Sequence, residues 1–376
     1  MAPSTDDHFA PTPPKRILSL DGGGIRGVLS LQILRRLEEL FGSPLSDSFD
    51  LIGGTSTGSI IATGLALGWS VDQLQEMYRE LGHVVFRRHP LRIGFLNAKF
   101  PREPLERALV DAFGDTCLGD EAVRTGLAIV CKRLDTGSPW VLHNNPRGKF
   151  FESEDPAAHA PNRAYRLREL VRASTAAPYY FDPEHIEVAE GEVGLFIDGG
   201  VSPHDNPALQ LLLLATLEGY GYEWPVGEDD LLLVSVGTGT WTRPDTASSL
   251  IEKSAGGHAV RALASMMVDA STFNRLLLQW LSRSPTAEEI DSEIGDLSND
   301  HLGDRAWLTY VRYDADLEDP GLETGPDGKP IDPKALAALR DIDRVENMEL
   351  LEEIGRVAAT RVRREHFPEV FLSDRP

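Results

Sequence analysis

Two glycine-rich turns, each lying between a short apolar run and a helical pattern, constrain the fold more than any other feature of this sequence. The first turn reads DGGGIRG at residues 21–27 and follows the apolar residues 17–20. The second reads GTSTG at residues 54–58 and follows residues 51–53. Glycine permits sharp turns that other residues resist. Strand-turn-helix units that repeat along one chain indicate a layered α/β fold.

The remaining apolar patterns extend this organisation. Short apolar runs, typical of buried strands, occur again at residues 127–131, 195–197 and 231–236. Apolar residues at helical spacing predict helices over residues 27–40, from residue 56 onward, over 258–280 and over 335–362. We therefore expect a largely parallel central sheet flanked by helices, with a helical C-terminal extension.

Length and composition suggest three segments. A chain of 376 residues that is 41% hydrophobic can bury a large core without disulfides or metals. Residues 1–14 contain four prolines and no apolar run, so we expect a disordered leader and a cytoplasmic protein without a signal peptide. We assign residues 15–240 to the core and residues 241–376 to a mainly helical part packed on it.

Charge limits the partners. A net charge of −22 argues against nucleic acid and against general attraction to anionic bilayers. Peripheral membrane association would need a local basic or apolar patch, and cations and aromatics interleave over residues 86–102. We expect either a membrane-facing lid there or a solvated loop whose aromatic residues pack inward. Residues 283–305 carry seven acidic residues and predict a solvated face or a partner surface.

The glycine loop at residues 21–27 admits three interpretations. It is a literal G-x-G-x-x-G with Asp47 about 20 residues further on, as in dinucleotide-binding folds. However, Asp47 lies in a loop and not at the tip of a second strand, and a P-loop is excluded because no Gly-Lys-Ser/Thr follows. The third interpretation is that consecutive glycines at a helix N-terminus present bare N–H groups to an oxyanion. It requires a nucleophile nearby.

Ser56, at the centre of G-x-S-x-G, is that nucleophile. Gly54 and Gly58 let the chain turn sharply enough to hold the serine hydroxyl exposed between an apolar strand and an apolar helix. The dipole of the following helix favours the negative charge that develops at such a site. The two glycine turns together indicate nucleophilic catalysis by serine.

A serine hydroxyl also needs a base. Asp198 ends the apolar run 195–197 and is followed by Gly199 and Gly200, which would project its carboxylate at the carboxyl edge of the sheet. Burial there would raise the pKa of Asp198 above the ordinary value of about 3.9. Among the ten histidines, His204 lies nearest to Asp198 and is the alternative base.

These motifs resemble the patatin-like phospholipase family. The two glycine turns and the Asp-Gly-Gly at residues 198–200 occur in the family's order, and residues 173–181, 206–207 and 235–239 match it further. The similarity covers residues 15–240. It implies a patatin-like catalytic core in which Asp198 deprotonates Ser56 without a histidine, hydrolysing a membrane phospholipid or another acyl-ester lipid through an acyl-enzyme.

The resemblance also implies the roles of neighbouring residues. The N–H groups of Gly22, Gly23 and Gly24 would hold the tetrahedral oxyanion, and Arg26 would support that loop or steady the anion. The supporting turn positions are Gly54, Gly58, Gly199 and Gly200. No cofactor or metal is implied. Several bacterial relatives are latent until an activator arrives, which can be a cyclic nucleotide, so a small-molecule or protein activator is expected.

Three alternatives stay open. One is a Ser-His-Asp esterase of the α/β-hydrolase type that uses His204. Another is a nucleotide-binding module built on the glycine loop at residues 22–27. The third is an acyl-chain-binding or scaffold protein that retains an inactive site.

Overall fold

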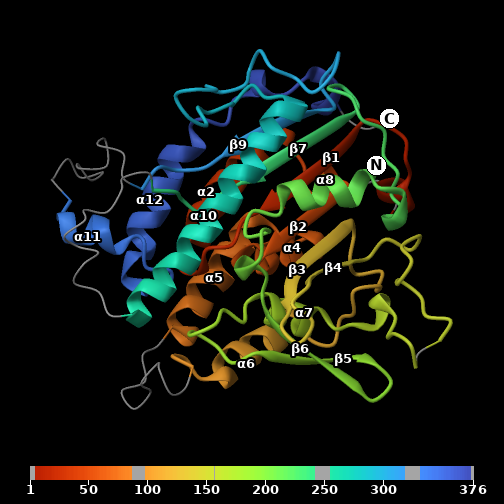
Figure 1. Ribbon diagram of the computed structural model, residues 1–376, viewed down its shortest axis with the longest axis vertical. Coiled ribbons are helices and arrows are strands. Elements are labelled where there is room, and N and C mark those ends of the chain that lie inside the picture. The colour runs from red at the N-terminus through yellow and green to blue at the C-terminus, as the bar shows by residue number, and fades with distance from the viewer. Residues whose placement is uncertain (1–4, 87–97, 156, 242–254, 318–330, 374–376) are drawn as a thin grey trace.

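The computed structural model describes residues 5–86, 98–155, 157–241, 255–317 and 331–373 (Figure 1). Most of the basic and aromatic stretch, residues 87–97, therefore lies outside the described residues. At its described ends the aromatic side chains pack inward. Phe100 is fully buried, and its ring centroid lies 5.5 Å from that of Phe86. Arg102 pairs with Glu184 at 2.7 Å.

A mixed sheet of nine strands forms the centre of the molecule. Its order is β5-β6-β3-β2-β1-β7-β9-β8, and β4 also pairs with β3. The strands are β1 Lys15–Leu20, β2 Leu51–Thr55, β3 Gly126–Arg133, β4 Pro139–His143, β5 Glu184–Ala189, β6 Glu192–Asp198, β7 Leu231–Val236, β8 Ser282–Arg283 and β9 Leu308–Tyr313. All five predicted strands are therefore present.

The predicted largely parallel arrangement is confirmed for the middle of the sheet. Neighbouring strands from β3 through β2, β1, β7 and β9 to β8 run parallel, whereas β4, β5 and β6 pair antiparallel. The register matters for the site, because Leu20 lies opposite Gly54 and Cys131 lies opposite Asp198. The ends of β1, β2 and β6 are thereby brought to one region of the sheet.

Helices cover both faces of the sheet. They are α1 Thr5–Phe9, α2 Gly27–Phe41, α3 Leu45–Ser48, α4 Thr57–Ala66, α5 Val71–Val85, α6 Arg102–Phe113, α7 Leu167–Ser174, α8 Ala208–Thr216, α10 Ala255–Leu281, α11 Pro333–Ala338 and α12 Met348–Ala359. Among the described helices, none is long and apolar enough to cross a bilayer.

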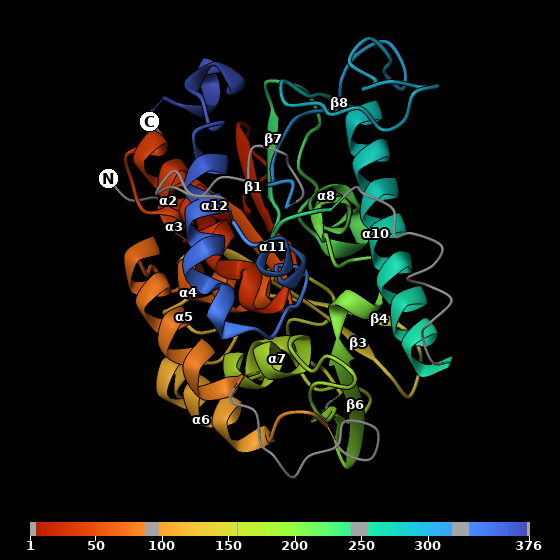
Figure 2. The same ribbon diagram turned by 90° about the vertical axis from the view of Figure 1, so that its left-hand side faces the viewer.

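The core has two halves because successive strand residues point to opposite faces. Leu18 and Leu20 pack in the larger apolar cluster with side chains of α2, α4, α5 and α12. Ile17 packs in the smaller cluster with side chains of α8 and α10. Figure 2 shows the same division, with α2, α5 and α12 on one side of the strands and α8 and α10 on the other.

The first helix of the core follows the sequence pattern closely. Val28, Leu31, Leu34 and Leu37 of α2 are all fully buried, so the predicted stripe faces the sheet. The helix ends at Gly42, whose φ of 69° is the left-handed conformation typical of a helix C-terminus. Burial of such a stripe is the main source of stability for a helix of this length.

The expectation of a disordered leader over residues 1–14 is wrong for its described part. Residues 5–9 form α1, and Phe9 is only 5% exposed. The Phe9 ring lies 5.9 Å from that of Tyr222, and its carbonyl oxygen accepts a hydrogen bond from the Arg147 guanidinium. One aromatic residue among the prolines is enough to dock the segment, because burying its ring removes a large apolar area from water.

The C-terminal part is also more integrated than predicted. Strand β9 pairs with β7 inside the main sheet, so the boundary at residue 240 does not separate the sheet from a helical appendage. The single helix expected over residues 335–362 is instead two helices, α11 and α12. Between them, the main-chain oxygen of Ile342 accepts a hydrogen bond from Ile25, which draws this segment onto the glycine loop.

Candidate active site

Ser56 lies in the turn between β2 and α4, in a backbone conformation that is rare for a residue with a side chain. Its φ is 52° and its ψ is −123°. A Cβ on Gly54 would lie 2.2 Å from the carbonyl carbon of Gly58, and one on Gly58 would lie 2.2 Å from the carbonyl oxygen of Leu20. These contacts allow only glycine at both positions. Strain of this kind costs about 1–3 kcal/mol and is kept where the surroundings enforce it.

Asp198, at the end of β6, lies directly beside Ser56. The Ser56 hydroxyl donates a hydrogen bond of 2.6 Å to Asp198 Oδ2, while the N–H of Gly200 donates one of 2.7 Å to Oδ1. Asp198 is 4% exposed. Burial raises the pKa of Asp198 to about 6, although the hydrogen bonds from Ser56 and Gly200 oppose the rise. The structure thus brings together the two predicted residues in the geometry of a nucleophile and its base.

Gly199 completes the turn that carries Asp198. A Cβ at Gly199 would lie 2.5 Å from the carbonyl oxygen of Val130, so the turn packs directly on β3. A Cβ at Gly200 would lie 2.7 Å from the carboxylate of Asp205. Both glycines are therefore required by close approach, as expected for a turn that fixes a carboxylate.

Ser174 holds the backbone of Ser56 from the other side. Its hydroxyl accepts a hydrogen bond of 2.8 Å from the N–H of Ser56 and donates one of 2.6 Å to Val130. The side chain is fully buried at the end of α7. The sequence contained a signal for this residue, because Ser174 lies in one of the segments that match the family, but no role was assigned to it.

The glycine loop lies next to Ser56 but differs in one respect from the prediction. The N–H of Gly22 donates a hydrogen bond of 2.9 Å to the main-chain oxygen of Asp205, so this predicted oxyanion donor is already engaged. In the part of the chain that the structure describes, the N–H groups of Gly23 and Gly24 make no hydrogen bond. Gly24 has a φ of 58°, and its Cβ would lie 2.3 Å from the Ile342 oxygen.

Arg26 is directed to the loop backbone. Its guanidinium donates to the carbonyl oxygens of Gly23 at 3.3 Å and Gly239 at 3.2 Å, and it lies 4.9 Å from the ring centroid of Trp241. Burial lowers the pKa of Arg26 from its ordinary value. Of the two roles considered for this residue, these contacts correspond to support of the loop.

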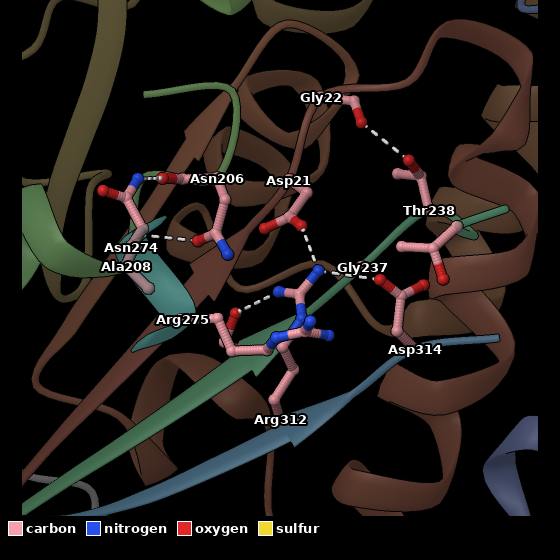
Figure 3. A network of polar contacts seen from close by, with 12 residues as sticks. Asp21, Gly22, Asn206, Ala208, Gly237, Thr238, Asn274, Arg275, Arg312 and Asp314 are labelled. Carbon is pink, nitrogen blue, oxygen red and sulfur yellow. Dashed lines mark hydrogen bonds and ion pairs between the residues drawn. The ribbon is translucent and has the colours of Figure 1, made fainter. Parts of the chain in front are cut away.

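A buried ionic network stands behind the glycine loop (Figure 3). Arg312 of β9 donates hydrogen bonds of 2.7 Å to Asp21 and to Asp314, and one of 2.7 Å to Ser235. Burial raises the pKa of Asp21 to about 7, and the charge of Arg312 opposes this rise. Sequence reasoning missed this network because Arg312 lies 291 residues from Asp21 and outside the similarity to the family.

The network reaches the glycine loop by two routes. Asp21 directly precedes Gly22 in the chain. In the second route, Asp314 accepts a hydrogen bond of 2.8 Å from the N–H of Gly239, and Thr238 donates one of 2.7 Å to the Gly22 oxygen. Figure 3 shows Thr238 directed at Gly22 and Arg312 held between its two acids.

Asp205 adds a second acid to the site. A Cβ on Gly22 would lie 2.3 Å from Asp205 Oδ1 and 3.4 Å from the Ser56 Cβ, which places this carboxyl group close to Ser56. Burial raises the pKa of Asp205 to about 7, and the neighbouring charge of Asp198 adds to the rise. The residue stands beside the Asn206-Pro207 pair that matches the family, which is the one sequence signal that could have found it.

His204 is not brought against the nucleophile by any hydrogen bond among the described residues. Its carbonyl oxygen accepts a hydrogen bond of 2.5 Å from Thr55, and burial lowers the pKa of its imidazole. Its ring Nδ1 is buried and has no hydrogen-bond partner in the described part of the chain. Asp47, required by the dinucleotide interpretation, lies in the short helix α3.

The two cysteines form no disulfide bond with each other. Cys117 and Cys131 are both free thiols, and burial raises the pKa of each. Over the described ranges, no group of three or more His, Cys, Asp or Glu side chains is arranged to hold a metal ion.

A layered α/β sheet with a strained serine at a strand-to-helix turn and a buried acid at hydrogen-bonding distance defines the serine hydrolase class of site. A sequence profile described as "Patatin-like phospholipase" matches residues 18–212. The chain belongs to this family. The matched region ends within α8, so β7, β9 and the network residues Arg312 and Asp314 lie beyond it, whereas Asp21 lies within it.

Several characterised proteins are similar to this chain. A cUMP-AMP-activated phospholipase of Escherichia coli is 32% identical over 230 residues, covering 61% of this chain and 66% of that protein. A cGAMP-activated phospholipase of Pseudomonas aeruginosa is 32% identical over 193 residues, covering 50% of this chain and 53% of that protein. The human calcium-independent phospholipase A2-gamma is 32% identical over 237 residues, which is 28% of its length. The similarity thus spans less than two thirds of each relative.

Proposed function

We propose that this protein is a lipid acyl hydrolase in which Ser56 is the nucleophile and Asp198 its base. The observation that carries the proposal is the 2.6 Å hydrogen bond from the Ser56 hydroxyl to Asp198 Oδ2 at a strained strand-to-helix turn. Membership of the patatin-like phospholipase family supports the choice of a carboxylic ester of a lipid as substrate.

In the first half of the reaction, Ser56 Oγ attacks the acyl carbonyl carbon while its proton passes to Asp198. The developing oxyanion would be met by the N–H groups of Gly23 and Gly24, which have no other acceptor among the described residues. The leaving alcohol then takes the proton from Asp198 as its bond to the acyl carbon breaks. The product of this half is an acyl ester of Ser56.

In the second half, water replaces the serine as the attacking group. Asp198 again accepts the proton, now from water, and returns it to Ser56 Oγ as the acyl bond breaks. A carboxylate whose pKa is raised to about 6 suits this role, because it is ionised near neutral pH and yet basic enough to accept a proton. The hydrogen bond from Gly200 holds the carboxylate in place through both halves.

We further propose that the substrate is a membrane phospholipid or a related acyl-ester lipid, and that activity is latent until a small molecule or protein activator binds. The printed names of two relatives describe phospholipases activated by cUMP-AMP and by cGAMP, which supports a cyclic nucleotide as the activator. We propose a cytoplasmic protein that meets the lipid by peripheral association. The charge of −22 continues to argue against nucleic acid as a partner.

The proposal is tested by release of fatty acid from vesicles of mixed phospholipids, with and without cGAMP, comparing the wild type with Ser56→Ala and Asp198→Asn. Ser298→Ala and Asp229→Asn, which change the same residue types at exposed positions, are the matched controls. We expect release by the wild type and both controls and none by the two site variants. Equal release by Ser56→Ala would refute the assignment of the nucleophile.

Two further measurements separate the remaining alternatives. Labelling of Ser56 by a fluorophosphonate distinguishes a latent enzyme, which reacts, from a scaffold with an inactive site, which does not. His204→Ala distinguishes a Ser-Asp pair from a Ser-His-Asp esterase, because loss of labelling in that variant would identify His204 as the base that activates Ser56. Titration with NAD tests the nucleotide-binding alternative.

A further inference from the structure

A pocket lies at the edge of the Arg312 network, and neither Ser56 nor Asp198 lines it. Its volume is about 240 Å³. Its lining comes from β9, from the segment after β8 and from the segment after α12, and includes Glu288, Arg312, Asp314, Arg361, Arg363 and His366. The lining therefore joins the strand β9 to the segment that follows α12.

The cations of this pocket outnumber its available acids. Glu288 is paired with Arg275 at 2.9 Å, and Asp314 is paired with Arg312 at 2.7 Å. Arg361 makes no ion pair with any described residue and is exposed. The net charge of the chain is −22, so a pocket lined by arginines has a local charge opposite to that of the whole protein. Such a site concentrates anions.

A further guanidinium group lines the pocket, together with the imidazole of His366, whose pKa is lowered by burial. Among the described residues Arg363 pairs with Glu365 at 3.2 Å, and an exposed pair of this kind contributes little against competing anions. His366 shares a hydrogen bond of 2.9 Å between its Nδ1 and the Tyr313 hydroxyl, so the other ring nitrogen is not used by this contact. The pocket thus offers two guanidinium groups and an imidazole around one small volume.

The shape and charge together define the ligand class. Planar guanidinium groups bind the oxygen atoms of phosphate in pairs, which makes arginine the preferred residue for phosphate esters. A volume of about 240 Å³ is below that of pockets that enclose a complete drug-sized ligand. It suits one phosphate group with part of the sugar or glycerol attached to it.

The pocket is also connected to the proposed active site, because two of its lining residues belong to the ionic network. Arg312 bonds Asp21, the residue before Gly22, and Asp314 bonds the N–H of Gly239. An anion in the pocket adds a negative charge beside the pair of Arg312 and Asp314. Any movement of these partners acts on the backbone that carries the free N–H groups of the glycine loop.

We propose that the pocket formed by Arg312, Arg361, Arg363 and His366 binds a phosphate-bearing anion, and that its occupancy changes the reactivity of Ser56 through the Arg312 network. The regulatory part rests on the proposed function. The binding part does not, because it requires only the lining residues. The phosphate can come from a soluble nucleotide or from a lipid headgroup, and the two sources share the chemistry that the pocket recognises.

The test measures binding in the full chain carrying Ser56→Ala, so that the result does not depend on hydrolysis. Inorganic phosphate and cGAMP are titrated by calorimetry, and vesicles with and without phosphatidylglycerol are tested by sedimentation. The variant is the double substitution Arg361→Gln with Arg363→Gln. The matched control is Arg364→Gln, which removes a neighbouring exposed arginine that pairs with Glu369 outside the pocket.

We expect the double variant to weaken phosphate binding at least tenfold, and Arg364→Gln to leave it within twofold. Loss of cGAMP binding in the double variant identifies a nucleotide source, and loss of vesicle binding alone identifies a headgroup. Equal binding by the double variant, or no binding of any probe to the parent, would contradict the proposal that the pocket binds a phosphate-bearing anion. Both variants are exposed substitutions, and their thermal unfolding is compared to confirm that they fold.

A second measurement tests the connection with Ser56. In the otherwise wild-type chain, we expect the saturating probe to change the rate of fluorophosphonate labelling of Ser56 at least threefold, and the double variant to lose that response. An unchanged rate with a bound probe overturns the regulatory part. Absence of labelling under all conditions contradicts the proposed function instead, while the binding result stands by itself.

Discussion

The main-chain oxygen of Asp205 accepts the N–H of Gly22 at 2.9 Å, and the carboxyl group of the same residue lies against the Gly22 Cα. One aspartate therefore both engages a donor of the glycine loop and introduces a second acid beside Ser56. This relationship leaves Gly23 and Gly24 as the loop donors for an oxyanion and makes Asp205 a source of instability at neutral pH.

Substitution of Gly24 by alanine should reduce activity strongly. Its φ of 58° and the Ile342 oxygen at 2.3 Å from an added Cβ mean that the loop must move. Loss of one oxyanion donor costs about 3 kcal/mol of transition-state stabilisation, so we expect kcat to fall on the order of 100-fold. The control is Gly42→Ala, which has a similar φ of 69° but open space around it. Comparable loss of kcat in both variants would contradict the argument.

The pH dependence of activity should follow Asp198. The carboxylate must be ionised to accept a proton, and burial raises its pKa to about 6. Activity should therefore rise with pH through about 6 and level off above it, falling to about a tenth at one pH unit below. The measurement is kcat/KM against pH for the wild type and for His204→Ala. If the pH dependence disappeared in His204→Ala, the group that controls activity would be His204 and not Asp198.

Replacing Asp205 by asparagine should stabilise the protein at high pH. Burial raises the pKa of Asp205 to about 7 in the folded protein, above the unfolded value of about 3.9. The folded state then binds the proton more tightly, so this residue lowers the free energy of unfolding as pH rises from about 4 to about 7. We expect Asp205→Asn to raise that free energy at pH 8 by on the order of 2 kcal/mol.

The effect of Asp205→Asn should vanish at pH 4, where the carboxyl group is protonated in the folded protein. Chemical denaturation at the two pH values measures it. Asp229→Asn, at an exposed position, should change stability at neither. A gain that is equal at both pH values would show that charge is not its cause.

Phe9 should contribute to global stability although it lies before the first strand. Its side chain is 5% exposed and packs against Tyr222. Phe9→Ala should lower the free energy of unfolding by about 3 kcal/mol, as for other buried aromatic residues. Phe150→Ala removes a ring that is 49% exposed and should have a smaller effect. Equal urea midpoints for Phe9→Ala and the wild type would contradict the docking of residues 5–9 and support a disordered leader.

The residues that sequence reasoning located share one property, which is that their signal is local. Ser56 follows an apolar strand between Gly54 and Gly58, and Asp198 ends an apolar strand before Gly199 and Gly200, so both the strands and the turns could be predicted. The antiparallel pairing of β6 with β3, which brings Asp198 to Ser56, is a tertiary contact that no local pattern specifies.

What was missed depends on pairing between distant parts of the chain. Arg312 looks like any arginine of a strand until β9 pairs with β7 and sets it beside Asp21. The helix expected over residues 335–362 is interrupted at Ile342, whose carbonyl oxygen accepts a hydrogen bond from the N–H of Ile25 in the glycine loop and not from a later residue of the same helix. Docking of the leader rested on a single phenylalanine, which is too weak a pattern to outweigh four prolines.

The hydrogen bond between Ile25 and Ile342 has a consequence for any attempt to isolate the family-matched half of this protein. A fragment cut after residue 240 would retain Ser56, Asp198 and every glycine of the loop, yet it would lack the acceptor that orients Ile25 and the arginine that balances Asp21. Such a fragment would carry every motif and still fail as a catalyst. The last third of the chain is therefore part of the proposed catalytic unit, and a fragment exchanged between relatives would need to include both parts.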